Sequence, residues 1–311
     1  MRLNRLDLNL LVALDALLTE KSITRAADQI CLSQPATSGA LARLREFFED
    51  ELLCRNGAHM VLTPLGESLK IPVHNILMQI QTTVERRLEF EPASSERCFR
   101  VLLSDYTSTT LMAKVVRQIS DIAPRMKLEL IAPTNDPQGK LEQGNIDFLI
   151  MPEKELSDKH PKAKLFDEDF VVIGCQNNPF LEIELTQETY LSLSHVSVRF
   201  GSQRKRSQDQ IILEQQYGIV QKVDVVTSTF ASIPQFLPGT NRIATVYRHL
   251  AEEWVNFLPL KIMPVPLLLS SIPWGIQWHS YRDLDPAIHW LKSEILKVVE
   301  IHYETSKTAP L

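Results

Sequence analysis

The spacing of apolar residues divides the chain into three regions. Five leucines near the N-terminus recur at three- and four-residue steps and would share one face of a helix. They are Leu10, Leu11, Leu14, Leu17 and Leu18. Short helical patterns continue to about residue 50, and a longer one runs over residues 64–89. After the small polar linker at residues 92–95, strand-like runs alternate with helical stretches.

The alternating region predicts an α/β fold. Strands are expected at Phe99–Leu103, Lys127–Ile131, Ile146–Met151, Phe170–Cys175, Val196–Arg199, Gln221–Val226, Ile243–Val246 and Leu267–Trp274. Helices are expected at Thr107–Ile122, Gln138–Gln143, Gln208–Gln216, Thr229–Phe236 and Pro286–Ile301. This order predicts mixed or parallel sheets with helices on their faces. The region is long for a single sheet, so we expect two lobes.

Composition narrows the class of protein. The chain has 311 residues, of which 44% are hydrophobic and 23% charged, with a net charge of −5. These values are ordinary for a globular protein of two or three domains. No apolar run is long enough to cross a bilayer. The first residues mix Arg2, Arg5 and Asp7 with leucines, unlike an export signal, so a cytoplasmic protein without membrane contact is expected.

Several kinds of chemistry lack their usual motifs. The sequence contains no GxxxxGK[ST], GxGxxG, GxSxG or HExxH, which lowers the expectation of an enzyme and favours a binding protein. The four cysteines lie far apart without a CxxC pair, which argues against a disulfide framework or a zinc site. They are Cys31, Cys54, Cys98 and Cys175. We therefore predict no catalytic residues, no metal and no cofactor.

Residues 22–48 have the pattern of a helix-turn-helix. Ser22 is a candidate N-cap for a helix that continues to Ile30, and small Ala26 and Ala27 would let a second helix cross closely. Ser33 is a second candidate N-cap, followed by a proline in the first turn, where a missing N–H costs nothing. Two short helices joined by a tight turn form a helix-turn-helix, which we place at about Ile23 to Ala42.

The second helix has an apolar and a polar face. Its buried residues are expected to be Ala40, Leu41, Leu44 and Phe48, and Leu32 in the turn would join the core. The other face would present Gln34, Thr37, Ser38, Arg43 and Arg45. Gln34 can pair with adenine, and Thr37 or Ser38 can contact base edges or phosphates. The free N–H groups after Ser33 can hold a phosphate.

A β-wing at residues 55–62 would complete this domain and place Arg55 near the DNA backbone or minor groove. The predicted DNA-contacting residues are Ser33, Gln34, Pro35, Thr37, Ser38, Arg43 and Arg55. The alternative is a small helical bundle with a solvated polar face. Residues 1–90 carry 11 acidic and 10 basic side chains, which is not the basic footprint of a lone DNA-binding module. A dimer would double the contacts and weaken this objection.

Residues 64–89 predict a long linker helix. Thr63 and Pro64 form a strong helix start. Seven apolar residues follow at three- and four-residue steps, and such a stripe can pair with a second helix. They are Leu65, Leu69, Val73, Ile76, Ile80, Val84 and Leu88. Pro72 predicts a bend. The alternative is that the stripe packs on the C-terminal part of the same chain.

Hydroxyl and aromatic side chains follow three of the predicted strands. They occur at residues 104–110, 200–202 and 227–230. In open α/β sheets a ligand binds outside the carboxyl ends of strands, where hydroxyls and helix N-termini bind oxygen-bearing groups. Asp105 argues against an anion and would cap a helix. The alternative for each Ser or Thr is a helix cap without ligand contact.

The sequence resembles the LysR-type transcriptional regulators. The run AADQICLSQPATSGALARLR (26–45), followed by ELLCRNGAHMVLTPLGESL (51–69), carries the resemblance, and GNIDFLI (144–150) and WHSYRDLDPAIHWL (278–291) extend it. The branch of nodulation and aromatic-catabolism regulators is the most similar, through residues 6–27 and 90–106. Leu53 and Cys54 depart from the usual pattern, as does Arg45, which would add a cation near DNA.

The resemblance implies a domain order and a ligand site. Residues 1–63 would form a winged helix-turn-helix, 64–91 a dimerisation helix and 92–311 a periplasmic-binding-protein-like effector domain. Its first lobe would hold about 97–167 and 274–303, and its second about 168–273. Near the cleft the resemblance places Ser104, Thr107, Phe200, Ser202, Thr229 and Thr245. It implies small aromatic effectors such as flavonoids or salicylate-like acids, homodimers that pair into tetramers, and RNA polymerase as a partner.

We therefore predict a regulator that binds double-stranded DNA at a dyad operator and responds to a small molecule. The rival is an α/β ligand-binding protein or enzyme whose N-terminal helices serve only oligomerisation. A second rival is a regulator that needs no ligand.

Overall fold

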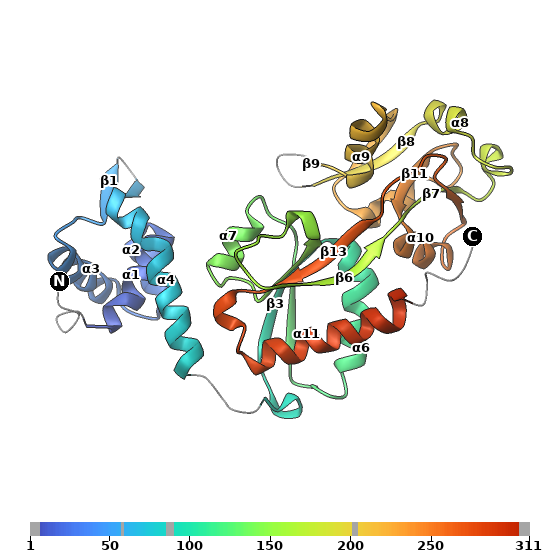
Figure 1. Ribbon diagram of the computed structural model, residues 1–311. Coiled ribbons are helices and arrows are strands. Elements are labelled where there is room, and N and C mark those ends of the chain that lie inside the picture. The colour runs from blue at the N-terminus through green and yellow to red at the C-terminus, as the bar shows by residue number, and fades with distance from the viewer. Residues whose placement is uncertain (1–6, 57–58, 85–89, 201–204, 305–311) are drawn as a thin grey trace. The chain divides into compact units, whose positions relative to one another are not determined.

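The computed structural model describes residues 7–56, 59–84, 90–200 and 205–304. The chain divides into two compact units (Figure 1). The first unit contains residues 1–87 with 142–144, and the second contains 88–141 with 145–311. Within the described residues, no helix has the length and apolar character needed to cross a membrane.

The first unit is a helical bundle with a small hairpin. Its elements are α1 (Asn9–Glu20), α2 (Ile23–Gln29), α3 (Gln34–Phe48), β1 (Leu53–Asn56), β2 (His59–Leu62) and α4 (Pro64–Val84). The five N-terminal leucines are buried in one core with residues of α3, as predicted. The predicted wing is confirmed as the antiparallel pair β1–β2, in which Arg55 lies opposite Met60.

Helix α4 packs only part of its apolar stripe. Leu65, Leu69 and Val73 lie against the core of the first unit, where α4 packs on α1. Ile76 and Ile80 continue the same stripe but are 46% and 41% exposed. Leu88 and the side chain of Val84 lie outside the described residues. The prediction of one uninterrupted intersubunit stripe is therefore wrong for its first half, because the bundle already covers it.

One sheet of the second unit has five strands. They are β3 (Cys98–Leu102), β4 (Lys127–Ile131), β5 (Phe148–Pro152), β6 (Lys162–Glu168) and β13 (Ile272–Gln277), in the order β4-β3-β5-β13-β6. Strand β3 is parallel to β4 and β5, whereas β13 is antiparallel to both its neighbours. The associated helices are α5 (Asp105–Thr107), α6 (Ala113–Ile119), α7 (Pro137–Glu142) and α11 (Pro286–Val299). We call this part the first lobe.

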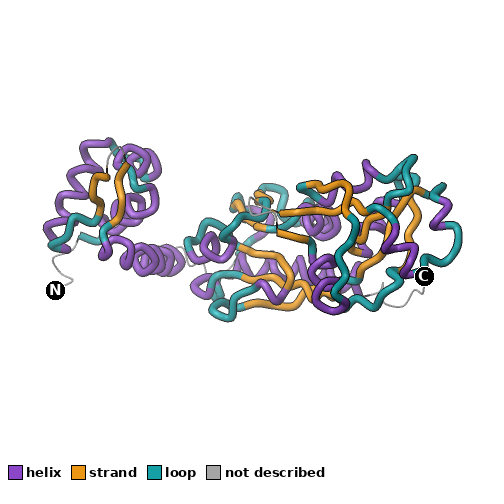
Figure 2. Tube along the Cα trace, turned by 90° about the horizontal axis from the view of Figure 1, so that it is seen from above, coloured by secondary structure: helices purple, strands orange, loops and turns teal. Residues whose placement is uncertain are grey.

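The second lobe contains a six-stranded sheet. Its strands are β7 (Phe170–Cys175), β8 (His195–Phe200), β9 (Lys205–Arg206), β10 (Val223–Thr227), β11 (Ile243–Tyr247) and β12 (Leu260–Pro264). The order is β10-β8-β11-β7-β12, with β9 on β8. The helices are α8 (Gln187–Ser192), α9 (Gln208–Tyr217) and α10 (Arg248–Val255). Figure 2 shows the strands of the second unit gathered into these two groups.

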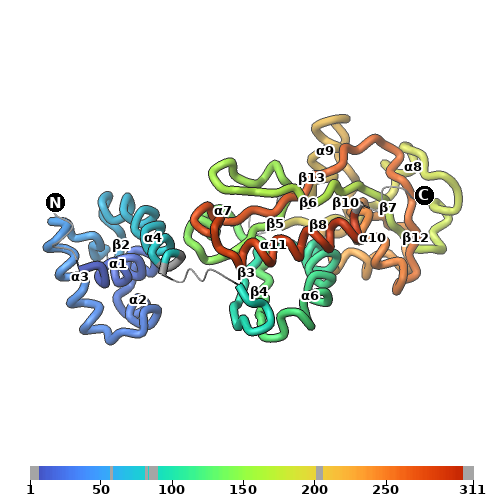
Figure 3. Tube along the Cα trace, turned by 60° about the horizontal axis from the view of Figure 1, so that its bottom comes forward, coloured from blue at the N-terminus to red at the C-terminus, as the bar shows by residue number. Residues whose placement is uncertain are grey.

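Short helical turns complete the second unit. Among the described residues, five are 3₁₀ turns, at Pro92–Ser94, Glu153–Glu155, Pro179–Leu181, Phe230–Phe236 and Ser280–Arg282. Two are π turns, at Ser108–Met112 and Glu300–Glu304. Helices α6 and α11 pack on each other beside the first lobe's sheet (Figure 3). The chain passes between the lobes at Asp169, which joins β6 to β7, and again between β12 and β13.

The structure confirms the predicted α/β class and most of the predicted strands. Three strands were missed: β6 and β12, which lie at sheet edges, and the two-residue β9, which pairs with β8. In β6 the exposed Lys162 and Lys164 precede two buried apolar residues and a buried acid, Glu168, and β12 is interrupted by Lys261, so neither strand shows a clear apolar period. The strand predicted at Leu267–Trp274 is wrong in its first half, because pairing begins only at Ile272 and Leu268 is 85% exposed. The predicted helix from Thr107 to Ile122 is interrupted by the π turn at its start.

Candidate nucleic-acid interface and effector site

Helices α2 and α3 form the predicted helix-turn-helix. The Ser22 hydroxyl accepts a hydrogen bond from the N–H of Arg25 (3.4 Å), and Ala26 and Ala27 are buried where the helices meet. The turn is closed by a bond of 3.0 Å from the N–H of Leu32 to the Ala27 carbonyl. Cys31 takes a left-handed conformation (φ 54°) at this turn, which the sequence analysis did not predict because glycine usually fills such positions.

The first turn of α3 leaves a polar surface. The Ser33 hydroxyl accepts from the N–H of Ala36 (3.4 Å), which confirms this residue as an N-cap. Gln34, Pro35 and Ser38 are exposed. The opposite face buries Ala40, Leu41 and Leu44, as predicted. The helix is therefore held from one side, and its N-terminal half is free for another molecule.

Two expectations for this region are wrong. Thr37 is fully buried, and its hydroxyl donates to the Ser33 carbonyl (3.2 Å). A buried hydroxyl with that bond stabilises the helix start and does not reach DNA. Leu32 is 50% exposed, because the tight turn points its side chain outward and not into the core.

The cations of the first unit divide into paired and unpaired groups. Arg43 and Arg55 are exposed, and neither has an ion-pair partner among the described residues. Arg25 pairs with Glu20 at 2.9 Å. Arg45 donates to the carbonyls of Glu51 (2.9 Å) and Leu53 (2.7 Å). The expectation that Arg45 adds a cation near DNA is therefore wrong, because its guanidinium holds the turn after α3.

The predicted effector residues occupy different positions in the second unit. Ser104 caps α5 by accepting from the N–H of Thr107 (3.4 Å), and Thr107 is buried with its hydroxyl on the Ser104 carbonyl. Thr229 bonds the Ser232 hydroxyl (2.8 Å). The Phe200 ring lies 5.3 Å from that of Phe230. Ser202 lies outside the described residues. Three predicted residues, Ser104, Phe200 and Thr229, thus have partly exposed side chains at the ends of β3, β8 and β10.

Thr245 belongs to the interior of the second lobe. It is 7% exposed, and its hydroxyl lies 2.7 Å from that of Tyr190, which also accepts from Gln221 (2.6 Å). This placement corrects the expectation that Thr245 faces the inter-lobe site, because its hydrogen-bonding capacity is satisfied under α8.

Asp209 is an acidic member of this buried polar group. The residue is 4% exposed at the start of α9. Burial raises the pKa of its carboxyl to about 6, although hydrogen bonds from Ser207 and Gln221 act in the opposite direction. The carboxyl therefore changes charge near neutral pH.

An aromatic cluster joins the two lobes. The Tyr106 ring lies 4.6 Å from Tyr247, 5.2 Å from Trp274 and 6.1 Å from Phe230. All four rings are at least 95% buried in one core that spans both sheets. The indole N–H of Trp274 has no hydrogen-bond partner within the described residues. Tyr106 lies in the ligand segment predicted at residues 104–110, but the sequence did not predict this cluster, because its members come from distant segments.

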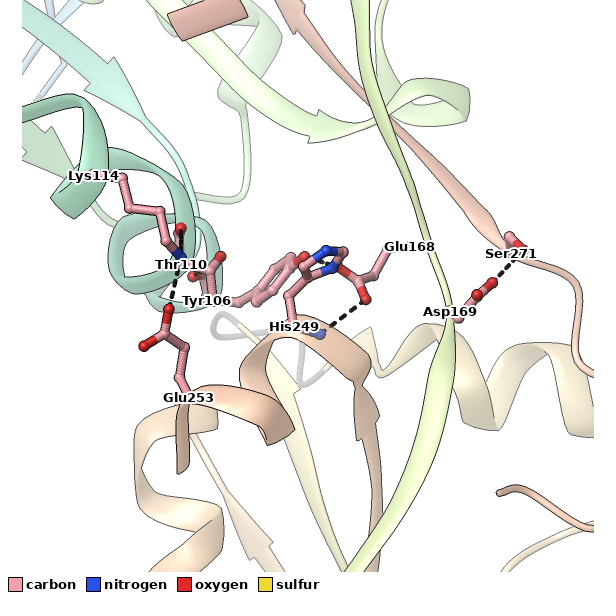
Figure 4. A network of polar contacts seen from close by, with 8 residues as sticks. All are labelled: Tyr106, Thr110, Lys114, Glu168, Asp169, His249, Glu253 and Ser271. Atoms are coloured by element: carbon pink, nitrogen blue, oxygen red, sulfur yellow. Dashed lines mark hydrogen bonds and ion pairs between the residues drawn. The ribbon is translucent and has the colours of Figure 1, made fainter. Parts of the chain in front are cut away.

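A polar network lies beside the aromatic cluster (Figure 4). The Tyr106 hydroxyl donates to the fully buried carboxylate of Glu168, which also bonds His249 Nδ1 at 2.8 Å. Burial, followed by the Glu168 charge, raises the pKa of Tyr106 well above its usual range, so the phenol keeps its proton. Lys114 on α6 pairs with Glu253 on α10 at 2.6 Å. This network ties the first lobe to the second.

A further bond crosses between the lobes at the predicted ligand segment. The Asp105 carboxylate accepts from the N–H of Ala231 (2.9 Å), at the start of the 3₁₀ turn in the second lobe. The prediction that Asp105 caps the helix following the first strand is wrong, because Ser104 is the N-cap of α5 and Asp105 instead caps a turn of the opposite lobe. The lobes are in contact here, and the side chains of the aromatic cluster pack against one another between them.

Two surface depressions lie elsewhere on the second unit. One, of about 520 Å³, is lined by Phe90, Leu284 and residues of α11, and another, of about 170 Å³, lies between Lys114 and α10. None of the predicted effector residues lines either one. Among residues covered by the structure, no three His, Cys, Asp or Glu side chains are grouped so as to hold a metal ion.

Comparison with known proteins places both units in one family. Residues 8–67 match the model described as "Bacterial regulatory helix-turn-helix protein, lysR family", and residues 93–300 match "LysR substrate binding domain". The chain is 43% identical over 298 residues to Nodulation protein D 1 of Mesorhizobium japonicum, covering 96% of this chain and 94% of that protein. It is 41% identical over 296 residues to Nodulation protein D 3 of Rhizobium meliloti, covering 95% and 94%.

Solved structures share the fold. A probable transcriptional regulator of Pseudomonas aeruginosa is 27% identical, with a TM-score of 0.63 over 94% of this chain and 97% of that one. Full-length OxyR of the same organism has a TM-score of 0.71 over 96% and 95%, at 17% identity. At that identity the likeness concerns the fold alone.

Asp209 predicts a pH-dependent stability of the second unit. A carboxyl whose pKa rises from 3.8 to about 6 on folding destabilises the folded state above pH 6, by about 3 kcal/mol at 1.36 kcal/mol per pH unit. The penalty disappears as pH falls from 6 towards 4. We expect Asp209→Asn to raise the free energy of unfolding at pH 8 by up to this amount, and by only about a third as much at pH 4.5.

Urea unfolding followed by tryptophan fluorescence measures this effect, because all four tryptophans lie in the second unit. Asp121→Asn, which alters an exposed carboxyl of the same unit, is the matched control. An equal effect of Asp209→Asn at both pH values would contradict the assignment.

Proposed function

Because the chain belongs to the LysR family of bacterial transcription regulators, we propose that it binds a dyad operator as a dimer and responds to a small aromatic effector. Members of this family are DNA-binding regulators with an effector-binding domain, and not enzymes. The rival of an enzyme whose N-terminal helices serve only oligomerisation is therefore wrong. The exposed polar N-terminal half of α3 is the observation on which the DNA-reading proposal depends.

The reading surface combines a base-reading group with phosphate contacts. Gln34 is the first residue of α3 and exposed, and its amide can pair with an adenine in the major groove. Ser33 and Ser38 border it. Pro35 has no N–H and the N–H of Ala36 is bonded to Ser33, so the backbone N–H of Gln34 is the donor that the first turn of α3 offers to a phosphate. Arg43 on α3 and Arg55 on the wing supply charge on both sides. Pro35 shapes the start of the helix without donating a hydrogen bond.

The exposed half of the α4 stripe supports dimerisation. Ile76 and Ile80 lie on the same helix face as Leu69 and Val73, which are covered by the first unit. An apolar stripe that continues past its own core is typical of a helix that pairs with a second copy. Dimerisation places two α3 helices for successive major grooves about 34–36 Å apart.

A tetramer needs a second contact surface, and we place it on the first lobe. Val116 on α6, Ile122 and Leu130 are 44%, 46% and 40% exposed. Leu130 lies in β4, an edge strand with unpaired backbone groups. Exposed edge strands flanked by apolar residues pair readily with another chain, which supports the joining of two dimers here.

The inter-lobe region is the proposed effector site. Ser104, Phe200 and Thr229 offer hydroxyls and an aromatic wall beside the cluster of Tyr106 and Trp274. Aromatic walls with a few polar groups suit a flat aromatic ligand. The described lobes are in contact here, so the effector must favour an arrangement in which Tyr106 and its neighbours move apart. That differential binding would change the geometry of the assembly.

Substitution of Gln34 separates base reading from general DNA affinity. We expect Gln34→Ala to weaken binding to the cognate operator by about 1–3 kcal/mol and to leave binding to unrelated duplex nearly unchanged. Arg55→Ala should instead weaken both by similar factors and reduce the salt dependence by about one counterion. Fluorescence anisotropy over a salt series measures both effects. Equal losses on both duplexes for Gln34→Ala would refute its base-reading role.

Charges on the exposed stripe of α4 are expected to dissociate the dimer. Glutamates in place of Ile76 and Ile80 would bury two uncompensated charges where the two α4 helices pair. We therefore expect the double variant Ile76→Glu/Ile80→Glu to sediment as a monomer at micromolar concentration. Ile71 is 50% exposed on α4 but lies off the stripe, so Ile71→Glu should remain dimeric. A dimeric double variant in analytical ultracentrifugation would exclude α4 as the pairing surface.

Aromatic acids and phenols are expected to bind between the lobes. Trp274 is part of the aromatic cluster, so ligand binding should change its fluorescence. A ligand that binds only the folded protein should also raise the melting temperature. Loss of one aromatic wall in Phe200→Ala should weaken binding about three- to tenfold. Phe180→Ala, at an exposed ring of the second lobe, should not. A screen of such compounds without any shift would favour a regulator that needs no effector.

A further inference from the structure

A group of polar contacts lies where α3, the hairpin and α4 meet. Helix α3 ends at Phe48, the chain turns through residues 49–52 into β1, and β2 leads through Thr63 into α4. One turn therefore joins the proposed reading helix to the proposed dimerisation helix. Its contacts decide whether these two helices move together.

A single carboxylate oxygen holds two parts of this turn. Asp50 Oδ1 accepts from the N–H of Leu52 (2.7 Å) and from the Thr63 hydroxyl (2.6 Å). The bond from Thr63, followed by that from Leu52, lowers the pKa of the Asp50 carboxyl, so the carboxylate remains charged and accepts both bonds at neutral pH.

Thr63 passes this constraint to α4. Its hydroxyl donates to Asp50 and accepts from the N–H of Gly66 (3.0 Å) in the first turn of α4. Its backbone N–H donates to the Leu52 carbonyl (3.0 Å). A hydroxyl with both a fixed acceptor and a fixed donor has little rotational freedom, so the first turn of α4 is oriented relative to residues 50–52.

Packing at the same place leaves no room for a pivot. Leu52 is fully buried in a left-handed conformation (φ 59°), which a leucine adopts only when its surroundings hold it there. A Cβ at Gly66 would lie 2.5 Å from the Leu52 carbonyl oxygen, so the backbone of α4 approaches the backbone of this turn closely. On the other side, Arg45 of α3 holds the carbonyls of Glu51 and Leu53.

We propose that Asp50 and Thr63 are positioning residues that lock the angle between α3 and α4 and so set the half-site spacing that the dimer accepts. This inference rests on the proposed function, because it needs two reading heads joined through α4. Neither side chain touches DNA in this role. A locked joint makes the dimer hold its two α3 helices at one separation and rotation. A loosened joint lets each head find its half-site independently, which lowers avidity but widens the tolerated spacing.

Operators of altered spacing test the joint in the full-length protein. A cognate operator is selected from a random duplex library with the unaltered chain, and derivatives are made with one or two base pairs inserted between the half-sites. Two base pairs rotate one half-site by about 70° relative to the other. We expect this insertion to weaken binding of the unaltered protein at least tenfold.

Asp50→Ala and Thr63→Val are expected to bind the native operator more weakly, by about three- to tenfold, and to lose less than about threefold on the two-base-pair insertion. Binding to a duplex with one half-site should change by less than twofold. Because both residues act in one chain of bonds, the double variant should behave like either single variant. Asp50→Asn and Thr63→Ser keep the accepting and donating oxygens, so each should restore the strict spacing.

Controls separate a positioning role from loss of folding or of charge. Asp28→Ala removes an exposed carboxylate from the same unit and should shift the affinity for every spacing by the same factor. Circular dichroism and sedimentation confirm that each variant is helical and dimeric. If Asp50→Ala fails to fold, Thr63→Val carries the test.

The same spacing dependence in folded, dimeric Thr63→Val and in the unaltered protein would overturn the proposal. A different result, in which the unaltered protein binds no duplex or sediments as a monomer, would contradict the proposed function instead.

Discussion

The burial of one side of α3 is the constraint on which the DNA-reading surface depends. Ala40, Leu41 and Leu44 are almost completely excluded from water against α1 and α2. This apolar contact is non-directional and strong, and it fixes the helix without using polar groups of the opposite face. Gln34 and Ser38 therefore remain exposed on a helix that cannot turn away. Thr37 marks the border between the two faces, because its hydroxyl is buried whereas the hydroxyl of the next residue, Ser38, is exposed.

The second unit uses burial in a different way, because its apolar core runs from one sheet to the other. Tyr106, Tyr247 and Trp274 come from both lobes and pack together, so opening the lobes exposes apolar surface. Glu168 lies at the crossing between the lobes and is fully buried with two partners. Separating it from either one would leave a buried charge with less compensation. An effector acts on this arrangement only if it replaces the contacts that opening removes.

Local patterns in the sequence predicted local structure well, and distant contacts poorly. The N-caps at Ser22 and Ser33, the buried leucines of α1 and the hairpin depend on neighbouring residues, and all appear in the structure. The locations of Thr37 and Leu32 were mispredicted because both lie at a boundary where one turn of backbone decides the exposure. The partners of Arg45, Asp50 and Tyr106 were not predictable, since each depends on a residue that only the fold brings near. Thr245 shows the same limit, because strand alternation does not say which face of a sheet is covered.

The distribution of charge supports the proposed dimer. The chain is acidic overall, and two of the cations nearest the helix-turn-helix, Arg25 and Arg45, form intramolecular contacts. Few cations are left for phosphates, so the electrostatic term that dominates non-specific DNA binding is small for each head. In the proposed dimer two heads on one frame would compensate, because the second binds at the high local concentration that the first creates. This gain would exist only if the frame held both heads at the spacing of the operator, and the proposed role of the angle between α3 and α4 is therefore as important for recognition as the residues that face the bases.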